Sequence, residues 1–148
     1  MSRSKVIERT ATLVDLEQFL IERVRLALNA WGVEVVAEPV PDYLGAAQRD
    51  RMAVIFWAGD SVDSPVNRLG RVHLSRRFRV LLTVKTLQSH RDGYRMVDDL
   101  LAGLTALYPQ DAVVGVPTSA GLVGFRDGGY SYEVEVSFST FIGGRTDD

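Results

Sequence analysis

Two glutamates near the C-terminus, Glu133 and Glu135, are the residues with the clearest capacity for chemistry. They alternate with apolar residues, so a strand would place both carboxylates on one face, about 7 Å apart. Glycoside hydrolases use carboxylate pairs at similar separations as acid and base. The simpler interpretation is cross-strand ion pairing with Arg79 or Lys85 on a solvated face. Because the sequence offers no sugar-binding cleft beside the pair, we expect ion pairing.

The two histidines, His73 and His90, are the other candidates for acid–base or metal chemistry. His73 falls in a basic segment, and His90 adjoins Ser89 and Asp92, which have an explanation as helix caps. The two histidines have no carboxylate partner at ligand spacing, and the chain has no cysteine. No serine stands in a nucleophile elbow, and no glycine-rich segment has phosphate-loop spacing. We therefore predict that the protein is not an enzyme and binds no metal or cofactor.

Length and composition favour one folded domain. The chain has 148 residues, of which 46% are hydrophobic and 24% charged, which excludes extensive disorder. The formal net charge of -2 argues against a protein that grips duplex DNA. The N-terminus lacks the apolar core of a signal peptide, and the longest apolar run, residues 52–58, is too short to cross a bilayer. We expect one cytoplasmic, soluble domain over residues 1–148, with flexible ends at about 1–10 and 143–148.

Residues 13–31 have the three- and four-residue spacing of an amphipathic helix. Thr12 or Asp15 can cap its N-terminus. Gly32 suits the left-handed residue that often follows a helix. We therefore expect a helix that ends at Gly32.

Residues 91–107 form a second apolar stripe of the same kind. Ser89 with Asp92 resembles a capping box, and Pro109 is expected to stop the helix after its last turn.

Five segments are predicted to be strands: residues 33–36, 52–58, 76–87, 122–126 and 130–142. The continuous apolar run at 52–58 is typical of a central strand, whereas the last strand alternates regularly. The order of helices and strands predicts an α+β fold, a two-layer sandwich with a mixed or antiparallel sheet of about five strands. Both helices are expected on one face, which leaves the other face open and polar.

The segment 60–77 is expected to be a long connection that forms a protruding hairpin. It turns from acidic to basic and carries interspersed aliphatic residues, a composition that suits either a solvated hairpin or an arm that docks on another subunit. Nucleic-acid binding is disfavoured because aromatic stacking residues are missing. The candidate docking residues are Arg68, Leu69, Arg71, Val72, His73, Arg76 and Arg77.

The hydrophobic patterning resembles that of a known family. Its elements are residues 35–39 (VVAEP), 52–59 (MAVIFWAG) and 78–84 (FRVLLTV), a helix containing Gly93 and Tyr94, and a terminal hairpin. In order and length these elements resemble the phage tail-terminator and minor tail proteins of Mu-like prophages and lambda-like long-tailed phages.

The resemblance implies a structural virion protein that forms a hexameric ring. Such a ring caps the tail tube, stops tube polymerisation and provides the surface for head–tail joining. The implied partners are further copies of the chain, the tail tube protein and head–tail connector proteins, with no membrane. DNA would pass through the lumen without specific binding, and assembly would take place in the host bacterial cytoplasm. The open-face residues Arg79, Lys85, Glu133 and Glu135 would line the lumen or contact an adjacent subunit.

Two other functions stay open at this stage. One is another head–tail connector or tail-completion protein of similar size. The other is a domain that binds a small ligand or peptide, with a cleft beside Trp57. An enzyme that uses Glu133 and Glu135 has the least support.

Overall fold

Two α-helices and six strands make up the part of the chain that the structure describes. The computed structural model describes residues 11–39, 50–63, 70–87, 89–105, 107–110, 113–126 and 128–143. The elements are α1 (Leu13–Ala27), the 3-10 turn η1 (Asn29–Trp31), β1 (Glu34–Ala37), β2 (Met52–Val62), β3 (Arg71–Val84), α3 (His90–Gly103), β4 (Leu107–Gln110), β5 (Val113–Arg126) and β6 (Gly129–Gly143). The ends predicted to be flexible lie, apart from residue 143, outside the described residues.

Helix α1 begins after a predicted cap, Thr12, but is shorter than predicted and ends before Gly32. The Thr12 side chain accepts a hydrogen bond from the Asp15 N–H at 3.1 Å, which satisfies a backbone donor of the first turn. The α-helix ends at Ala27, and η1 then leads to Gly32, whose φ is 66°. A tight final turn followed by a left-handed glycine closes the helix, so residues 29–31 are not α-helical.

Helix α3 starts as predicted and ends early. The Ser89 side chain accepts a hydrogen bond from the Arg91 N–H at 3.2 Å. The helix ends at Gly103, and Leu107 begins β4, a strand that the sequence analysis missed. Pro109 lies inside β4, where an edge strand tolerates a residue without an N–H. Pro109 therefore belongs to a sheet edge and does not act as the stop signal of the helix.

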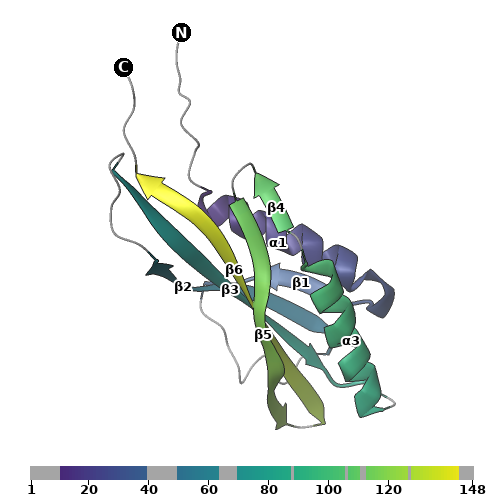
Figure 1. Ribbon diagram of the computed structural model, residues 1–148. Coiled ribbons are helices and arrows are strands. Elements are labelled where there is room, and N and C mark those ends of the chain that lie inside the picture. The colour runs from purple at the N-terminus through teal and green to yellow at the C-terminus, as the bar shows by residue number, and fades with distance from the viewer. Residues whose placement is uncertain are drawn as a thin grey trace.

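The six strands form one mixed sheet in the order β1-β2-β3-β6-β5-β4. β1 runs parallel to β2, and every other neighbouring pair is antiparallel. The sheet twists strongly along its length, and both helices lie on the same side of it (Figure 1). The predicted α+β class and helix placement are confirmed, whereas the sheet has six strands where about five were expected.

The connection between β2 and β3 is shorter than predicted. β2 continues to Val62 and β3 already begins at Arg71, so only residues 63–70 join them. Residues 71–77 are therefore strand, paired with β6 throughout and with β2 from Leu74 onward. The alternation of aliphatic and polar residues here is the two-residue period of a strand, which the sequence analysis assigned to a loop.

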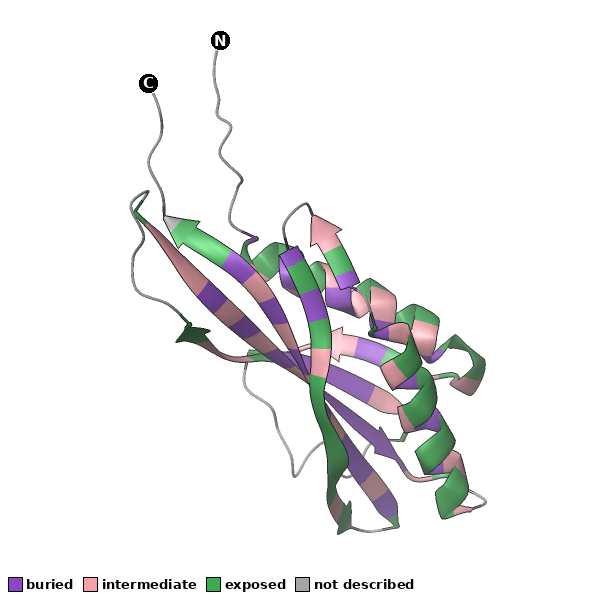
Figure 2. Cartoon of the chain, in the orientation of Figure 1, coloured by how far each residue is buried: buried purple, intermediate pink, exposed green. Residues whose placement is uncertain are grey.

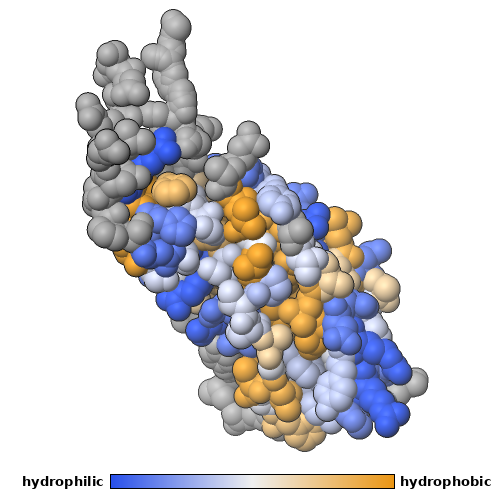
Figure 3. All heavy atoms as spheres, in the orientation of Figure 1, coloured by the Kyte–Doolittle hydropathy of each residue, from blue (hydrophilic) through white to orange (hydrophobic). Residues whose placement is uncertain are grey.

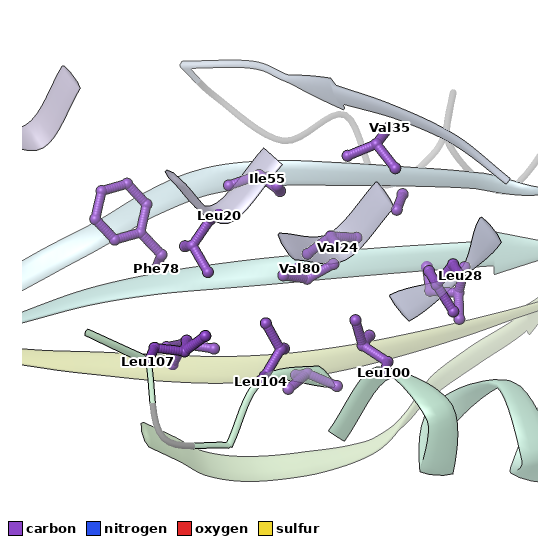
Figure 4. Close-up of a cluster of buried hydrophobic side chains, with 14 of the residues drawn as sticks. Leu20, Val24, Leu28, Val35, Ile55, Phe78, Val80, Leu100, Leu104 and Leu107 are labelled. Atoms are coloured by element: carbon purple, nitrogen blue, oxygen red, sulfur yellow. The ribbon is translucent and has the colours of Figure 1, made fainter. Parts of the chain in front are cut away.

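The main core lies between the helices and the sheet. Apolar side chains from the region of α1 and from the region of α3 pack onto the same face of the sheet (Figure 4). The helix-side residues are Leu20, Val24, Leu28, Leu100 and Leu104, the sheet residues are Ile55, Phe78 and Val80, and all are almost fully buried. Burial of each large aliphatic side chain contributes about 1.5–3 kcal/mol. Buried and partly exposed residues alternate along β3 and β6, as expected for strands with one covered face (Figure 2).

The opposite face of the sheet is polar only in part. Val54, Phe56 and Leu81 are buried there, with Val36 and Met52 packed against them. This small apolar cluster lies over β2 and β3, where an open polar face was expected. None of the helices in the described residues is long and apolar enough to cross a membrane.

Candidate functional site

The predicted ion pairing between β3 and β6 is present on the face opposite the helices. Arg79 on β3 lies beside both glutamates of β6, with its Nε 3.2 Å from Glu135 Oε1 and 3.9 Å from Glu133 Oε1. Thr118 on β5 donates to the second carboxylate oxygen of Glu135 at 3.1 Å. The carboxylates therefore belong to a three-strand polar cluster. At this exposure its ion pairs contribute about 1 kcal/mol or less each.

Lys85 does not join this cluster. It follows the last residue of β3, and its backbone N–H donates to Asp50 Oδ1 at 2.9 Å. The Asp50 carboxylate also accepts from the Thr86 N–H and hydroxyl. Burial acts to raise the pKa of Asp50, but the hydrogen bonds from Lys85 and Thr86 and the nearby Arg51 charge outweigh it and lower that pKa. Sequence reasoning missed this junction because nothing in the local pattern pairs residue 50 with residue 86.

The predicted docking residues fall mostly inside the sheet. Arg68 and Leu69 lie outside the described residues. Arg71, Val72 and His73 lie at the start of β3, half-buried and paired with β6.

Arg76 and Arg77 point to opposite faces of β3. Arg76 is 8% exposed, donates to the Ala11 carbonyl at 3.2 Å and lies 3.5 Å from Asp60. Arg77 is half-buried, and its Nε has no hydrogen-bond partner among the described residues. Arg76 is therefore paired within its own chain and is not displayed for a partner.

His73 takes part in a hydrogen-bonded group that the sequence analysis did not foresee. Its Nε2 shares a hydrogen bond with the hydroxyl of Ser139 on β6. Its Nδ1 lies 3.3 Å from Asp63, which also accepts from the Ser75 hydroxyl. The histidine was expected in a basic loop, and the register of β3 against β6 brings it to Ser139 instead.

The Ser139, His73 and Asp63 side chains follow the order of a hydrolase triad, but the surroundings do not suit catalysis. Triads are recognised by the roles of their members and by an oxyanion hole beside the nucleophile. Ser139 lies in mid-strand, in ladder register with Ser75 on β3 and Val114 on β5. The strand N–H groups point along the sheet to these neighbours, so none is directed at the space in front of the serine hydroxyl. The group therefore fastens the end of the β2–β3 hairpin to β6.

His90 and Trp57, the other singled-out residues, lie at the surface. His90 is exposed at the start of α3 and packs edge-on against Tyr94, with 5.2 Å between ring centroids. Trp57 is 46% exposed and its Nε1 donates to Asp60 at 2.9 Å. The hollow beside Trp57 has a volume of about 230 Å³, below the range of about 300–1,000 Å³ usual for small-molecule sites.

A second hollow, of about 270 Å³, separates α3 from β5. Its lining is almost wholly apolar and includes Tyr94, Val97, Leu122 and Tyr132. Figure 3 shows apolar surface gathering over β5 and the end of its hairpin with β6, beside the polar outer face of α3. The exposed apolar residues of β5, counted over both of its faces, are Val114, Val116, Leu122, Val123 and Phe125.

Two solved structures resemble this arrangement. A chain from the virion of a native gene transfer agent particle matches with a TM-score of 0.58 and 9% sequence identity, over 86% of this chain and 95% of that chain. The PVC sheath/tube terminator of an extracellular contractile injection system, in its extended state, matches with a TM-score of 0.53 and 17% identity. The chain therefore shares its fold with both structures. The match covers 95% of this chain and 62% of the terminator's own length.

The two matches confirm, at the level of the fold, the resemblance read from the hydrophobic patterning. No protein-family model and no curated protein matches the chain in sequence. The likeness is therefore carried by the order and pairing of the elements and by no shared motif. Among the described residues, neither the His73 group nor the Glu133 and Glu135 pair has the geometry of a catalytic site.

Proposed function

We propose that the chain is a structural tail protein that assembles as a hexameric ring on the end of a tail tube. The ring stops tube polymerisation and provides the surface on which the head is joined. The observation that carries the proposal is the match to a sheath/tube terminator over 95% of the chain. The match to 95% of a chain from a virion supports the same class of assembly.

The distribution of polar and apolar groups supports a role performed by surfaces. The carboxylates of Glu133 and Glu135 are engaged by Arg79, and His73 is engaged by Asp63 and Ser139. In contrast, β5 exposes apolar side chains to solvent. Exposed apolar surface of this kind often marks a contact with another protein. In the proposed ring, Arg79, Glu133 and Glu135 face the lumen or the adjacent subunit, and the near-neutral chain lets DNA pass without specific binding.

Deletion of the gene that encodes this chain, followed by inspection of the particles that form without it, tests the proposal. Without a terminator the tube continues to grow, so electron micrographs should show tails longer than those of the parent, without heads attached. Expression of the intact chain in trans should restore both length and joining. Tails of parental length that lack heads would instead identify the protein as a connector or tail-completion protein. Normal particles would contradict both assignments.

We extend the proposal to the connection between β2 and β3 and the start of β3, which dock on the tube or on a neighbouring subunit. The docking residues are Arg68, Leu69, Arg71, Val72 and His73. Arg76 and Arg77 support them from within the sheet. The variant Arg68→Glu/Arg71→Glu should produce overlong tails while keeping the circular dichroism of the parent chain. Arg91→Glu, on the exposed start of α3, serves as the matched charge reversal and should keep tail length. Normal tails from the double variant would remove the hairpin from the docking surface.

A further inference from the structure

Strand β5 has a long edge with no partner in the described part of the chain. β6 pairs with it from Val114 to Arg126, whereas β4 reaches only Val113 and Gly115 on the other side. The six residues 118–123 are exposed on both faces of the strand. No charged residue occurs between 113 and 125. Charges are a usual protection of edge strands against pairing with another chain.

Strand β2 has a second such edge on the opposite side of the sheet. β1 pairs with it only from Met52 to Ile55. From Trp57 to Val62 no strand within the described ranges covers its outer edge, and Val62 is 67% exposed. A bulge at Ala58 separates the covered part from the residues 59–62. On β5, two bulges bracket a segment of the same length, residues 119–122.

We propose that the free edge of β5 pairs with the free edge of β2 of the next copy, which extends the sheet from subunit to subunit around the ring. The inference rests on the proposed ring, and it assigns the seam between its members. β2 and β5 run antiparallel to one another, because three successive antiparallel pairings separate them. Rotation about a ring axis preserves strand direction, so one copy's β2 meets the next copy's β5 as an antiparallel pair.

The two free edges lie at different levels of the sheet, and this offset has the size that a tilted closed sheet needs. Gly121, in the free part of β5, is level with Glu133, Leu81 and Val54 through the paired strands. Asp60 lies in the free part of β2, six residues beyond Val54. The free part of β2 is therefore displaced by ~20 Å along the strand from the level of Gly121. The four strands β2, β3, β6 and β5 add ~19 Å across the sheet per subunit. Equal displacements along and across correspond to a tilt of ~45°, close to that of closed barrels.

The seam also accounts for the hollow between α3 and β5. Leu122 and Ala120 point to the helix side of the sheet, as does Val62 at the end of β2. When the helix sides of both copies face the same way and Ser61 of the next copy lies opposite Gly121, Val62 of that copy lies opposite Ala120 and diagonally across from Leu122, at the hollow that both residues line. A second copy therefore supplies both backbone partners and an apolar side chain to this surface.

Disulfide capture tests the seam, because the chain has no cysteine of its own. Ser61 and Ser119 point to the face opposite the helices, as does Gly121, where a side chain meets open space. Within one chain Ser61 and Ser119 are three strands apart, at least about 14 Å across the sheet, and are also offset along the strands, which is too far to bridge. Oxidised assemblies of Ser61→Cys/Ser119→Cys or Ser61→Cys/Gly121→Cys should give a covalent ladder ending at the full ring on a denaturing gel.

The matched control changes only the face. Ser61→Cys/Ala120→Cys places the two thiols on opposite sides of the sheet and should give at least about tenfold less ladder. A mixture of the single variants Ser61→Cys and Ser119→Cys should stop at dimers, because each subunit then carries one thiol and can form one disulfide. Unchanged circular dichroism establishes that each variant folds. Leu122→Asp should weaken assembly about tenfold or more in sedimentation, whereas Val14→Asp on the exposed side of α1 should not.

The outcomes separate this inference from the proposed function. Hexamers seen by native mass spectrometry, with no ladder from either same-face pair, would overturn the seam and leave the tail role intact. Equal ladders from the same-face and opposite-face pairs would also overturn it. Two results together would overturn both the seam and the proposed function. The first is that the chain forms no ring, either in solution or on tail tubes. The second is that tail length is unchanged when the gene is deleted.

Discussion

The Asp50 carboxylate accepts hydrogen bonds from the backbone of Lys85 and Thr86 and from the Thr86 hydroxyl. Arg51, with a left-handed φ of 52°, completes the junction by donating to the Trp31 carbonyl at 2.6 Å. The residues before β2 are thereby fastened both to the exit of β3 and to the turn after α1.

We predict that Asp50→Ala lowers the free energy of unfolding by about 1 kcal/mol at pH 7, a modest value because the site is solvent-exposed. The pKa of Asp50 is lowered in the folded state, so its stabilisation is complete above the unfolded pKa of about 3.9. It declines as the pH falls through the lower folded pKa. Urea unfolding at pH 7 and near pH 3 measures the difference, which should shrink at the acidic pH. Asp98→Ala, on the exposed surface of α3, is the control, and a pH-independent difference would contradict the assigned cause.

The alternation of side chains between the two faces of a strand explains which contacts could be predicted from the sequence. Arg79, Glu133 and Glu135 could be paired from sequence because a strand fixes which side chains share a face, and opposite charges favour neighbouring strands. The His73–Ser139 hydrogen bond could not, since it depends on the register of β3 against β6 over fourteen residue pairs. A shift of one residue would move all these side chains to the other face, and only packing of the whole sheet selects the register.

At the scale of the elements, the close approach of the two helices depends on one glycine. A Cβ atom at Gly103 would lie 2.4 Å from the Ala27 Cβ and 3.3 Å from its Cα. The end of α3 therefore packs directly on the end of α1.

Gly103→Ala should destabilise the fold by about 1–3 kcal/mol through overpacking, although alanine is the better helix former. Thermal and urea unfolding measure the loss. Ala27→Gly in the same chain should recover part of it, because it removes the atom that clashes. Gly121→Ala, where a side chain meets open space, should change stability by less than about 1 kcal/mol. A stable Gly103→Ala protein would show that the helices can separate freely.

The elements that sequence reasoning found are those with an uninterrupted period. β6 alternates over its whole length, and α1 and α3 carry apolar residues at helical spacing. The pattern is broken in β5, where Gly115, Pro117 and two bulges interrupt the alternation, so only residues 122–126 were recognised. β4 is too short to show a period and contains Pro109. Both missed segments lie at the side of the sheet that carries the unpaired edge of β5.

At the scale of the whole molecule, the unpaired edges and the covered core should differ in how they open. The amides of β3 are held between β2 and β6 over buried side chains, so their exchange with solvent requires large-scale opening. The residues 118–123 of β5 are exposed on both faces and paired on one side only among the described residues. In the free subunit, the outward-pointing amides of this segment should exchange rapidly.

Assembly should change this pattern in a restricted way. Hydrogen–deuterium exchange of the ring should show strong added protection at residues 118–123 and 59–62. Protection of β3 residues 78–82 should change little. Amides gain this protection by forming hydrogen bonds or by exclusion from water. If β5 of one copy pairs with β2 of the next, residues 118–123 and residues 59–62 must therefore gain protection together. Leu122→Asp should abolish the gain in both segments at once, although it alters only β5. A ring that protects one segment without the other would place β2 and β5 in separate contacts.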